Sequence, residues 1–166
     1  MKKQFLTIVL MIVTSAVFAQ SPIEKGQSQL NAGFGFSSWG LPVYVGLDYG
    51  IHKDFTIGGQ LSYRSYSESF LAKDYNSTVI GISAIGNYHF NTLLDIEKEW
   101  DVYAGLNLGF NIWSTSSGYP GNHTSGLGLG LQIGGRYYFS SNWAVNLEFG
   151  GGNAASGAQI GISYKF

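Results

Sequence analysis

Apolar side chains recur at every second position through most of this chain, and no other sequence feature constrains its fold as strongly. The pattern begins near residue 28, continues to the last residue and falls into eight separate runs. A period of two is that of a β-strand with two different faces, and no stretch shows the 3.6-residue period of an amphipathic helix. The sequence therefore predicts eight strands, within residues 30–36, 43–49, 55–63, 80–90, 100–112, 127–139, 143–149 and 158–166.

The second face of these strands differs in kind from the apolar face. Its positions carry mostly glycine, amide and hydroxyl side chains, and the apolar positions carry no charged residue. A soluble barrel would cover its outer face with charges, but only 11% of this chain is charged, against about 25% in soluble domains. Small residues suit the crowded lumen of an eight-stranded barrel. The pattern favours an all-β, eight-stranded antiparallel up-and-down transmembrane β-barrel over a secreted, lipocalin-like carrier.

The connections between the predicted strands alternate in length. Residues 50–54 and 140–142 form short connections, whereas residues 65–77 and 114–125 form long ones. Short turns at one rim and long loops at the other are typical of membrane barrels, with the short turns in the periplasm. Residues 91–99 are the exception on the short side, and their apolar residues are expected to form one helical turn at the interface.

Aromatic residues gather at the ends of the predicted strands. In an up-and-down topology, the rim with the short turns receives ten of them on the apolar face. Aromatic rings favour the headgroup level of a bilayer, so this row predicts an interfacial girdle. Its members are Tyr49, Phe55, Tyr88, Phe90, Trp100, Tyr137, Phe139, Trp143, Tyr164 and Phe166.

The N-terminus carries the pattern of an export signal. Lys2 and Lys3 precede an apolar run at residues 5–18, and Val17 and Ala19 are small residues at the −3 and −1 positions of a cleavage site. The run is shorter than the ~20 residues of a membrane-spanning helix. We therefore expect a cleavable signal peptide at 1–19, a short N-terminal segment at 20–27 and the barrel domain at 28–166.

A few charged residues fall on the second face, where they would point into the lumen: Asp48, Arg64, Arg136, Glu148 and Lys165. Unpaired charge in a narrow lumen is costly, so we expect a salt-bridge network that fills it. With a tight turn at 140–142, Arg136 lies opposite Asn146 and diagonal to Glu148, which predicts a contact between Arg136 and Glu148. The alternative interpretation is the constriction of a narrow solute or ion channel.

Motifs for cofactor chemistry are absent from the sequence. It contains no cysteine and three histidines without ligand spacing, and the glycines of residues 126–130 alternate along a strand rather than forming a phosphate loop. The net charge of −1 excludes a basic nucleic-acid footprint. We expect no catalytic residue, no cofactor, no metal site and no nucleic-acid partner.

Four aromatic-rich strand segments, 86–91 (GNYHFN), 100–105 (WDVYAG), 135–139 (GRYYF) and 160–166 (IGISYKF), resemble the small outer-membrane β-barrel family of Gram-negative bacteria, which is OmpA/OmpX-like in architecture. The resemblance covers the chain from about residue 28 onward. It implies an integral outer-membrane protein in contact with lipid and lipopolysaccharide, with a final strand whose Phe166 is read by the barrel-assembly machinery. Aromatic residues in the expected loops 65–77 and 114–125 can mark a binding surface, so we expect a structural or surface-contact role with these segments as candidate sites for a surface ligand.

His123 and Ser125 form an H-x-S pair at the predicted outer rim. Lipid A deacylases are also eight-stranded outer-membrane barrels and carry such a pair at a comparable position. A histidine beside a serine is the start of a nucleophile–base arrangement. The sequence offers no acid that would orient His123, so a polar surface loop is the preferred interpretation and a lipid A-modifying enzyme the alternative.

Overall fold

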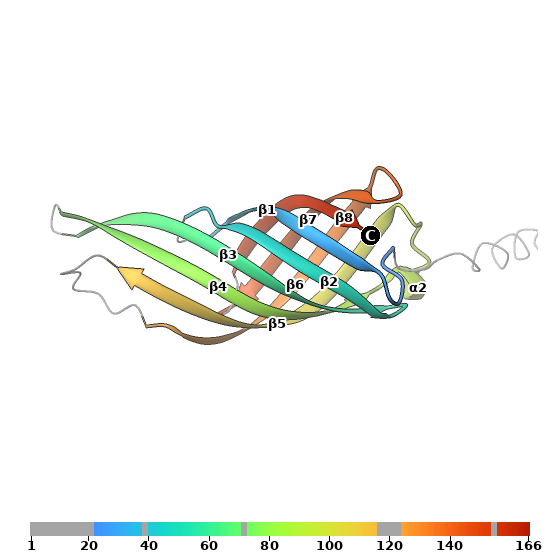
Figure 1. Cartoon of the computed structure of the whole chain (residues 1–166), viewed down its shortest axis with the longest axis horizontal. Coiled ribbons are helices and arrows are strands. Elements are labelled where there is room, and N and C mark those ends of the chain that lie inside the picture. Colours follow the sequence, from blue (N-terminus) through green and yellow to red (C-terminus); the bar gives the residue numbers. More distant parts are fainter. Residues whose placement is uncertain (1–21, 38–39, 71–72, 116–123, 154–155) are drawn as a thin grey trace, which may run out of the picture.

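The chain folds into a single closed barrel of tilted strands (Figure 1). The computed structural model describes residues 22–37, 40–70, 73–115, 124–153 and 156–166. The elements are β1 (Ser28–Phe36), β2 (Val43–His52), β3 (Phe55–Phe70), β4 (Lys73–His89), α2 (Asn91–Leu94), β5 (Trp100–Thr115), β6 (Gly126–Tyr138), β7 (Trp143–Gly152) and β8 (Gly157–Lys165).

Each strand pairs antiparallel with the next, and β1 also pairs with β8, which closes the sheet. The predicted eight-stranded, antiparallel up-and-down β-barrel is therefore confirmed. The predicted register across the 140–142 turn is confirmed as well, because Arg136 lies opposite Asn146. None of the helices in the described ranges is long and apolar enough to cross a membrane.

The barrel is inside out compared with a soluble protein. Leu106, Leu129 and Leu131 are each at least 65% exposed, whereas Asp48 and Arg136 are almost completely buried. Polar groups lie inside and apolar side chains outside, which is the arrangement of a barrel solvated by lipid. The alternative of a lipocalin-like carrier, with an apolar interior, is therefore wrong.

Strands β3 and β4 are much longer than the sequence pattern predicted. They stay paired out to Phe70 opposite Lys73, so most of the range expected to be the loop 65–77 is a β-hairpin. In Figure 1 this hairpin projects at the end of the barrel far from α2. The expectation of a loop was wrong because aromatic and hydroxyl side chains that alternate along the chain suit a two-stranded ribbon.

The opposite end of the barrel is closed by a short N-terminal segment and by α2. Ile23 is fully buried, and two backbone hydrogen bonds tie this segment to β2: Gly26 N–H donates to Gly50 O at 2.8 Å, and Gly50 N–H donates to Gln27 O at 2.9 Å. The predicted helical turn within 91–99 is confirmed as α2, whose Leu93 and Leu94 are exposed. Residues 1–19, the predicted signal peptide, lie outside the described residues.

Close backbone approach explains two glycines at the seam between β1 and β8. A Cβ on Gly33 would lie 2.2 Å from the carbonyl oxygen of Ile160, and a Cβ on Gly161 would lie 2.3 Å from that of Ala32. Contacts of this length are sterically impossible, so only glycine allows the two strands to meet here and close the barrel.

Candidate functional site

Arg136 is the centre of a polar cluster that crosses the lumen. Its Nη2 lies 2.7 Å from Asp48 Oδ2 and its Nη1 lies 2.9 Å from Asp101 Oδ2. The guanidinium also lies over the ring of Tyr103, 4.2 Å from the centroid. These residues are all at most 4% exposed. The two charge-assisted pairs link β2, β5 and β6 across the barrel, and they offset the desolvation cost of burying the charges.

The cluster continues from Asp101 to a buried histidine and a buried hydroxyl. His89 Nδ1 lies 2.7 Å from Asp101 Oδ1, and His89 Nε2 lies 3.0 Å from Thr56 Oγ1. A carboxylate only accepts, so Nδ1 carries a proton and donates to Asp101. The order hydroxyl, imidazole, carboxylate is that of a catalytic triad. All three residues are at most 1% exposed, so no substrate reaches the Thr56 hydroxyl in this conformation.

A second branch runs from Asp48 around the other strands. Asn31 Nδ2 donates to Asp48 Oδ2 at 3.0 Å, and Ser163 Oγ donates to Asn31 Oδ1 at 2.7 Å. Asn146 Nδ2 then donates to Ser163 Oγ at 2.9 Å, and Tyr44 donates to Asn146 Oδ1 at 2.9 Å. Together with the Arg136 branch, this series of hydrogen bonds includes at least one side chain from every strand. We call it the lumen belt.

Arg136 and Glu148, which were predicted to be in contact, do not form a direct ion pair. Glu148 Oε2 instead accepts a hydrogen bond from the Tyr103 hydroxyl at 3.0 Å, and the Arg136 guanidinium pairs with Asp48 and Asp101. The register explains this choice, because Asp101 lies directly opposite Arg136. Asp101 was not among the predicted lumen charges, although its position between the outward residues Trp100 and Val102 turns it toward the lumen.

The remaining predicted lumen charges lie near the two ends of the barrel. Arg64 Nη1 is 3.4 Å from Ser37 Oγ, on the side of the projecting hairpin. Lys165 Nζ donates to the carbonyl of Pro22 at 2.9 Å, at the other end. Of the five residues predicted to form one network, the structure joins Asp48 and Arg136 directly. Glu148 is linked to Arg136 through Tyr103, which contacts both residues. The structure does not join Arg64 or Lys165 to them.

Amide side chains fill the lumen above the belt. Asn107 Nδ2 donates to Gln132 Oε1 at 3.1 Å, and Gln132 Nε2 donates to Asn87 Oδ1 at 2.8 Å. The cavity beside Asn87, Gln132 and Arg136 has a volume of about 20 Å³, and the next cavity toward the hairpin has about 40 Å³. Such volumes hold one or a few water molecules.

The ten aromatic residues of the predicted girdle lie near the barrel end that carries α2, and several form cross-strand ring pairs. The centroids of Trp100 and Tyr137 are 4.7 Å apart, and those of Trp143 and Tyr164 are 4.8 Å apart. Phe166 at the C-terminus is 63% exposed. Aromatic cross-strand pairs stabilise sheets. Their position at a membrane interface stays a prediction.

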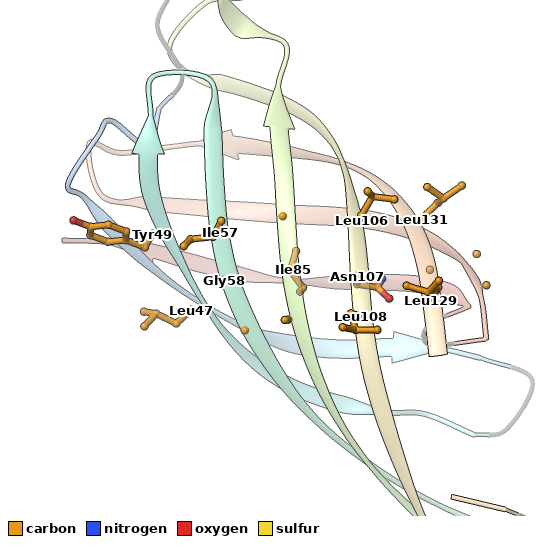
Figure 2. Close-up of a pocket in the computed structure, with 16 residues that line it drawn as sticks. Leu47, Tyr49, Ile57, Gly58, Ile85, Leu106, Asn107, Leu108, Leu129 and Leu131 are labelled. Carbon is orange, nitrogen blue, oxygen red and sulfur yellow. The ribbon is translucent and has the colours of Figure 1, made fainter. Parts of the chain in front are cut away.

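A cavity of about 1100 Å³ lies on the outer wall of the barrel rather than in the lumen. Figure 2 shows Leu47 and Tyr49 on one side of it and Leu106, Leu129 and Leu131 on the other. Gly59 and Gly86 have no side chains to fill the space between these two groups, so the surface is hollowed there. These leucines are exposed, so the depression presents an apolar surface to the surroundings of the barrel.

Only Ser125 of the predicted H-x-S pair lies within the described residues. His123 lies outside the described residues, and Ser125 Oγ accepts a hydrogen bond from the backbone N–H of Trp113 at 2.9 Å. Within the described ranges, no group of three His, Asp or Glu side chains is arranged to hold a metal ion.

Comparisons with known proteins agree with this architecture. The barrel resembles OprG of Pseudomonas aeruginosa with a TM-score of 0.65 and 12% identity, covering 88% of this chain and 99% of that one. It resembles Ail of Yersinia pestis with a TM-score of 0.55 and 15% identity, covering 86% and 99%. Ail in complex with the heparin analogue sucrose octasulfate gives a TM-score of 0.56 and 16% identity, again covering 86% and 99%. A search of curated proteins found no match.

A model of the outer membrane protein beta-barrel domain matches residues 5–166, which is nearly the whole sequence. The structural neighbours are too distant in sequence to indicate more than the fold, but the family match is independent of them. The chain therefore belongs to the outer membrane protein beta-barrel domain family.

Proposed function

We propose that this chain is a surface-contact protein of the outer membrane, anchored by its lipid-facing wall and making its contacts through the projecting β3–β4 hairpin. One observation carries the proposal. Among the described residues, β2 pairs with β3 only as far as Tyr63, whereas β3 and β4 remain paired to Phe70 and Lys73. Gly40 lies against Ser65 and Tyr66. Beyond them, residues 67–70 of β3 pair with β4 and extend past the end of the β2–β3 ladder, and a strand edge that extends past its neighbour can receive a further strand.

The chemistry of this surface indicates the kind of partner. Residues 65–77 and 114–125 contain Lys73 as their one Lys or Arg, together with many hydroxyl, amide and aromatic side chains. A polyanion such as the sucrose octasulfate bound by Ail needs clustered cations, which these segments lack. An extended polypeptide that pairs with the β3 edge is the better fit, with lipopolysaccharide around the barrel wall.

The absence of cysteine allows a direct test on living cells. Ser67→Cys adds a single thiol to the exposed outer part of β3, and Lys53→Cys adds one to the β2–β3 turn at the other end. We expect a membrane-impermeant maleimide to label Ser67→Cys only, and a photo-crosslinker at position 67 to give an adduct of defined mass. Labelling at Lys53 alone, or no adduct at position 67, would contradict the proposal.

The small cavities in the lumen support a second part of the proposal, that the barrel is filled and does not conduct. Refolded protein in planar bilayers is expected to show no discrete conductance steps. Steps that change in Arg136→Met would instead support the narrow channel. Ser125→Ala tests the alternative of a lipid A-modifying enzyme. We expect the variant and the original chain to release the same amount of acyl chain from lipid A, because Ser125 contacts the β5 backbone.

A further inference from the structure

A groove of about 490 Å³ opens at the barrel end that carries the short turns. Its walls are the N-terminal segment, the connection between α2 and β5, the β6–β7 turn and the end of β8. Its volume lies within the range of about 300–1,000 Å³ that is typical of small-molecule pockets. It is far larger than either cavity of the lumen, and the residues of the lumen belt do not line it.

The groove presents charges of both signs. Glu24 and Glu99 contribute carboxylates, and Lys98 and Lys165 contribute ammonium groups. The Lys165 ammonium is held in position, because it donates to the carbonyl of Pro22 at 2.9 Å and lies 5.4 Å from the centroid of the Tyr138 ring. An ammonium has three donors, so Lys165 can donate to a ligand as well.

A hydroxyl group and an exposed ring complete the wall. The backbone N–H of Trp143 donates to Ser140 Oγ at 3.0 Å, which leaves the hydroxyl proton of Ser140 for another acceptor. Phe139 is 57% exposed beside the paired rings of Trp143 and Tyr164. The groove therefore joins a polar, doubly charged surface to the lipid-facing wall of the barrel.

We propose that this groove binds the headgroup of a zwitterionic phospholipid that carries a primary ammonium, of the phosphatidylethanolamine type. Glu24 and Glu99 accept hydrogen bonds from the ammonium, Lys98 and Lys165 donate to the phosphate, and Phe139 contacts the start of the acyl chains. Both charges of such a headgroup find opposite charges in the groove. The inference rests on the membrane position of the barrel, and it is independent of the contacts proposed for the β3–β4 hairpin.

Lipid retention measured by native mass spectrometry tests the proposal. The refolded full chain is taken from vesicles with equal parts of phosphatidylethanolamine, phosphatidylcholine and phosphatidylglycerol with identical acyl chains. We expect the protein to retain at least threefold more phosphatidylethanolamine than either of the others. Phosphatidylcholine is the control for the ammonium group, because it has no N–H to donate to the carboxylates. Phosphatidylglycerol has no ammonium group, so its retention measures the attraction of the phosphate to lysine alone. Equal retention of the three lipids, or more phosphatidylglycerol, would overturn the proposal.

Paired variants assign the binding to the groove. The double variant Glu24→Gln/Glu99→Gln is expected to reduce phosphatidylethanolamine retention to the level of phosphatidylcholine. Lys98→Gln is expected to reduce the retention of both phosphatidylethanolamine and phosphatidylcholine. Glu97→Gln and Lys53→Gln alter exposed charges outside the groove and are expected to keep the threefold preference. Folding of each variant is checked by the mobility shift of unboiled samples. If the double variant does not fold, Glu99→Gln alone, at an exposed side chain, must halve the preference; an unchanged preference refutes the site.

Discussion

The two halves of the lumen are filled in different ways. The half nearest the short turns contains the lumen belt, in which Ser163, His89 and Asp101 are fully buried and hydrogen-bonded. The half nearest the projecting hairpin contains Gln60, Ser62 and other partly buried polar residues around the cavity of about 40 Å³. Buried ion pairs occur in the first half, whereas the second half contains mostly neutral polar side chains, together with Arg64, around the larger of the two lumen cavities.

This difference follows from the cost of burying charge. A guanidinium or carboxylate out of reach of water is tolerated only where several partners surround it. Hydroxyl and amide groups next to a cavity can be satisfied by water. We therefore expect most of the polar contribution to stability to come from the half with the belt, and the hairpin half to tolerate change.

Removing the central cation should have the largest effect. Arg136→Met leaves Asp48 and Asp101 buried without their shared partner, so we expect the free energy of unfolding to fall by about 3–5 kcal/mol. Urea titration of the refolded barrel in vesicles measures it. Arg64→Met is the matched control in the hairpin half, with an expected loss below about 1 kcal/mol. Equal losses in the two variants would show that the halves do not differ.

A neighbouring pair of glycines tests how tightly the belt is packed. A Cβ on Gly134 would lie 2.4 Å from the ring of Tyr103, which is held between Arg136 and Glu148. We expect Gly134→Ala to cost about 1–3 kcal/mol through overpacking. Gly135→Ala is the control, because its Cβ would face outward with its nearest neighbour at 3.7 Å. We expect it to change stability by less than about 0.5 kcal/mol in the same titration. A larger loss for Gly135→Ala would contradict this packing.

The alternation of side chains was sufficient to predict the strands, their faces and the pairing across tight turns. Asp48 and Arg136 were correctly turned toward the lumen, since facing depends only on local period. Contacts across the lumen depend on the stagger of all the strands, which a single sequence does not specify. The pair of Arg136 and Asp101 has a different reason: the tight turn fixes the register of β6 with β7, whereas the long connection between β5 and β6 does not specify that Asp101 lies opposite Arg136.

Some residues of the lumen belt were not predicted because nothing in their local sequence distinguishes them. Thr56 and Ser163 are common residues whose roles exist only through a partner on another strand. The outer hairpin was missed for a different reason, because polar alternation in residues 65–70 predicts a ribbon and a loop almost equally well. Composition alone does not separate these two structures, whereas continued pairing to Phe70 does.

The last prediction compares the loss of one hydrogen bond in the lumen belt with the loss of one in the projecting hairpin. Thr56→Val keeps the shape of the side chain but removes the hydroxyl 3.0 Å from His89 Nε2, which leaves a buried ring nitrogen without that partner. We expect a loss of about 1–3 kcal/mol in the free energy of unfolding. In the hairpin, Ser67 Oγ donates to Asn76 Oδ1 at 2.8 Å on an exposed surface. Since water replaces that bond, Ser67→Ala should stay within about 0.5 kcal/mol of the original chain. A loss for Ser67→Ala as large as that for Thr56→Val would mean that burial does not decide the strength of these bonds.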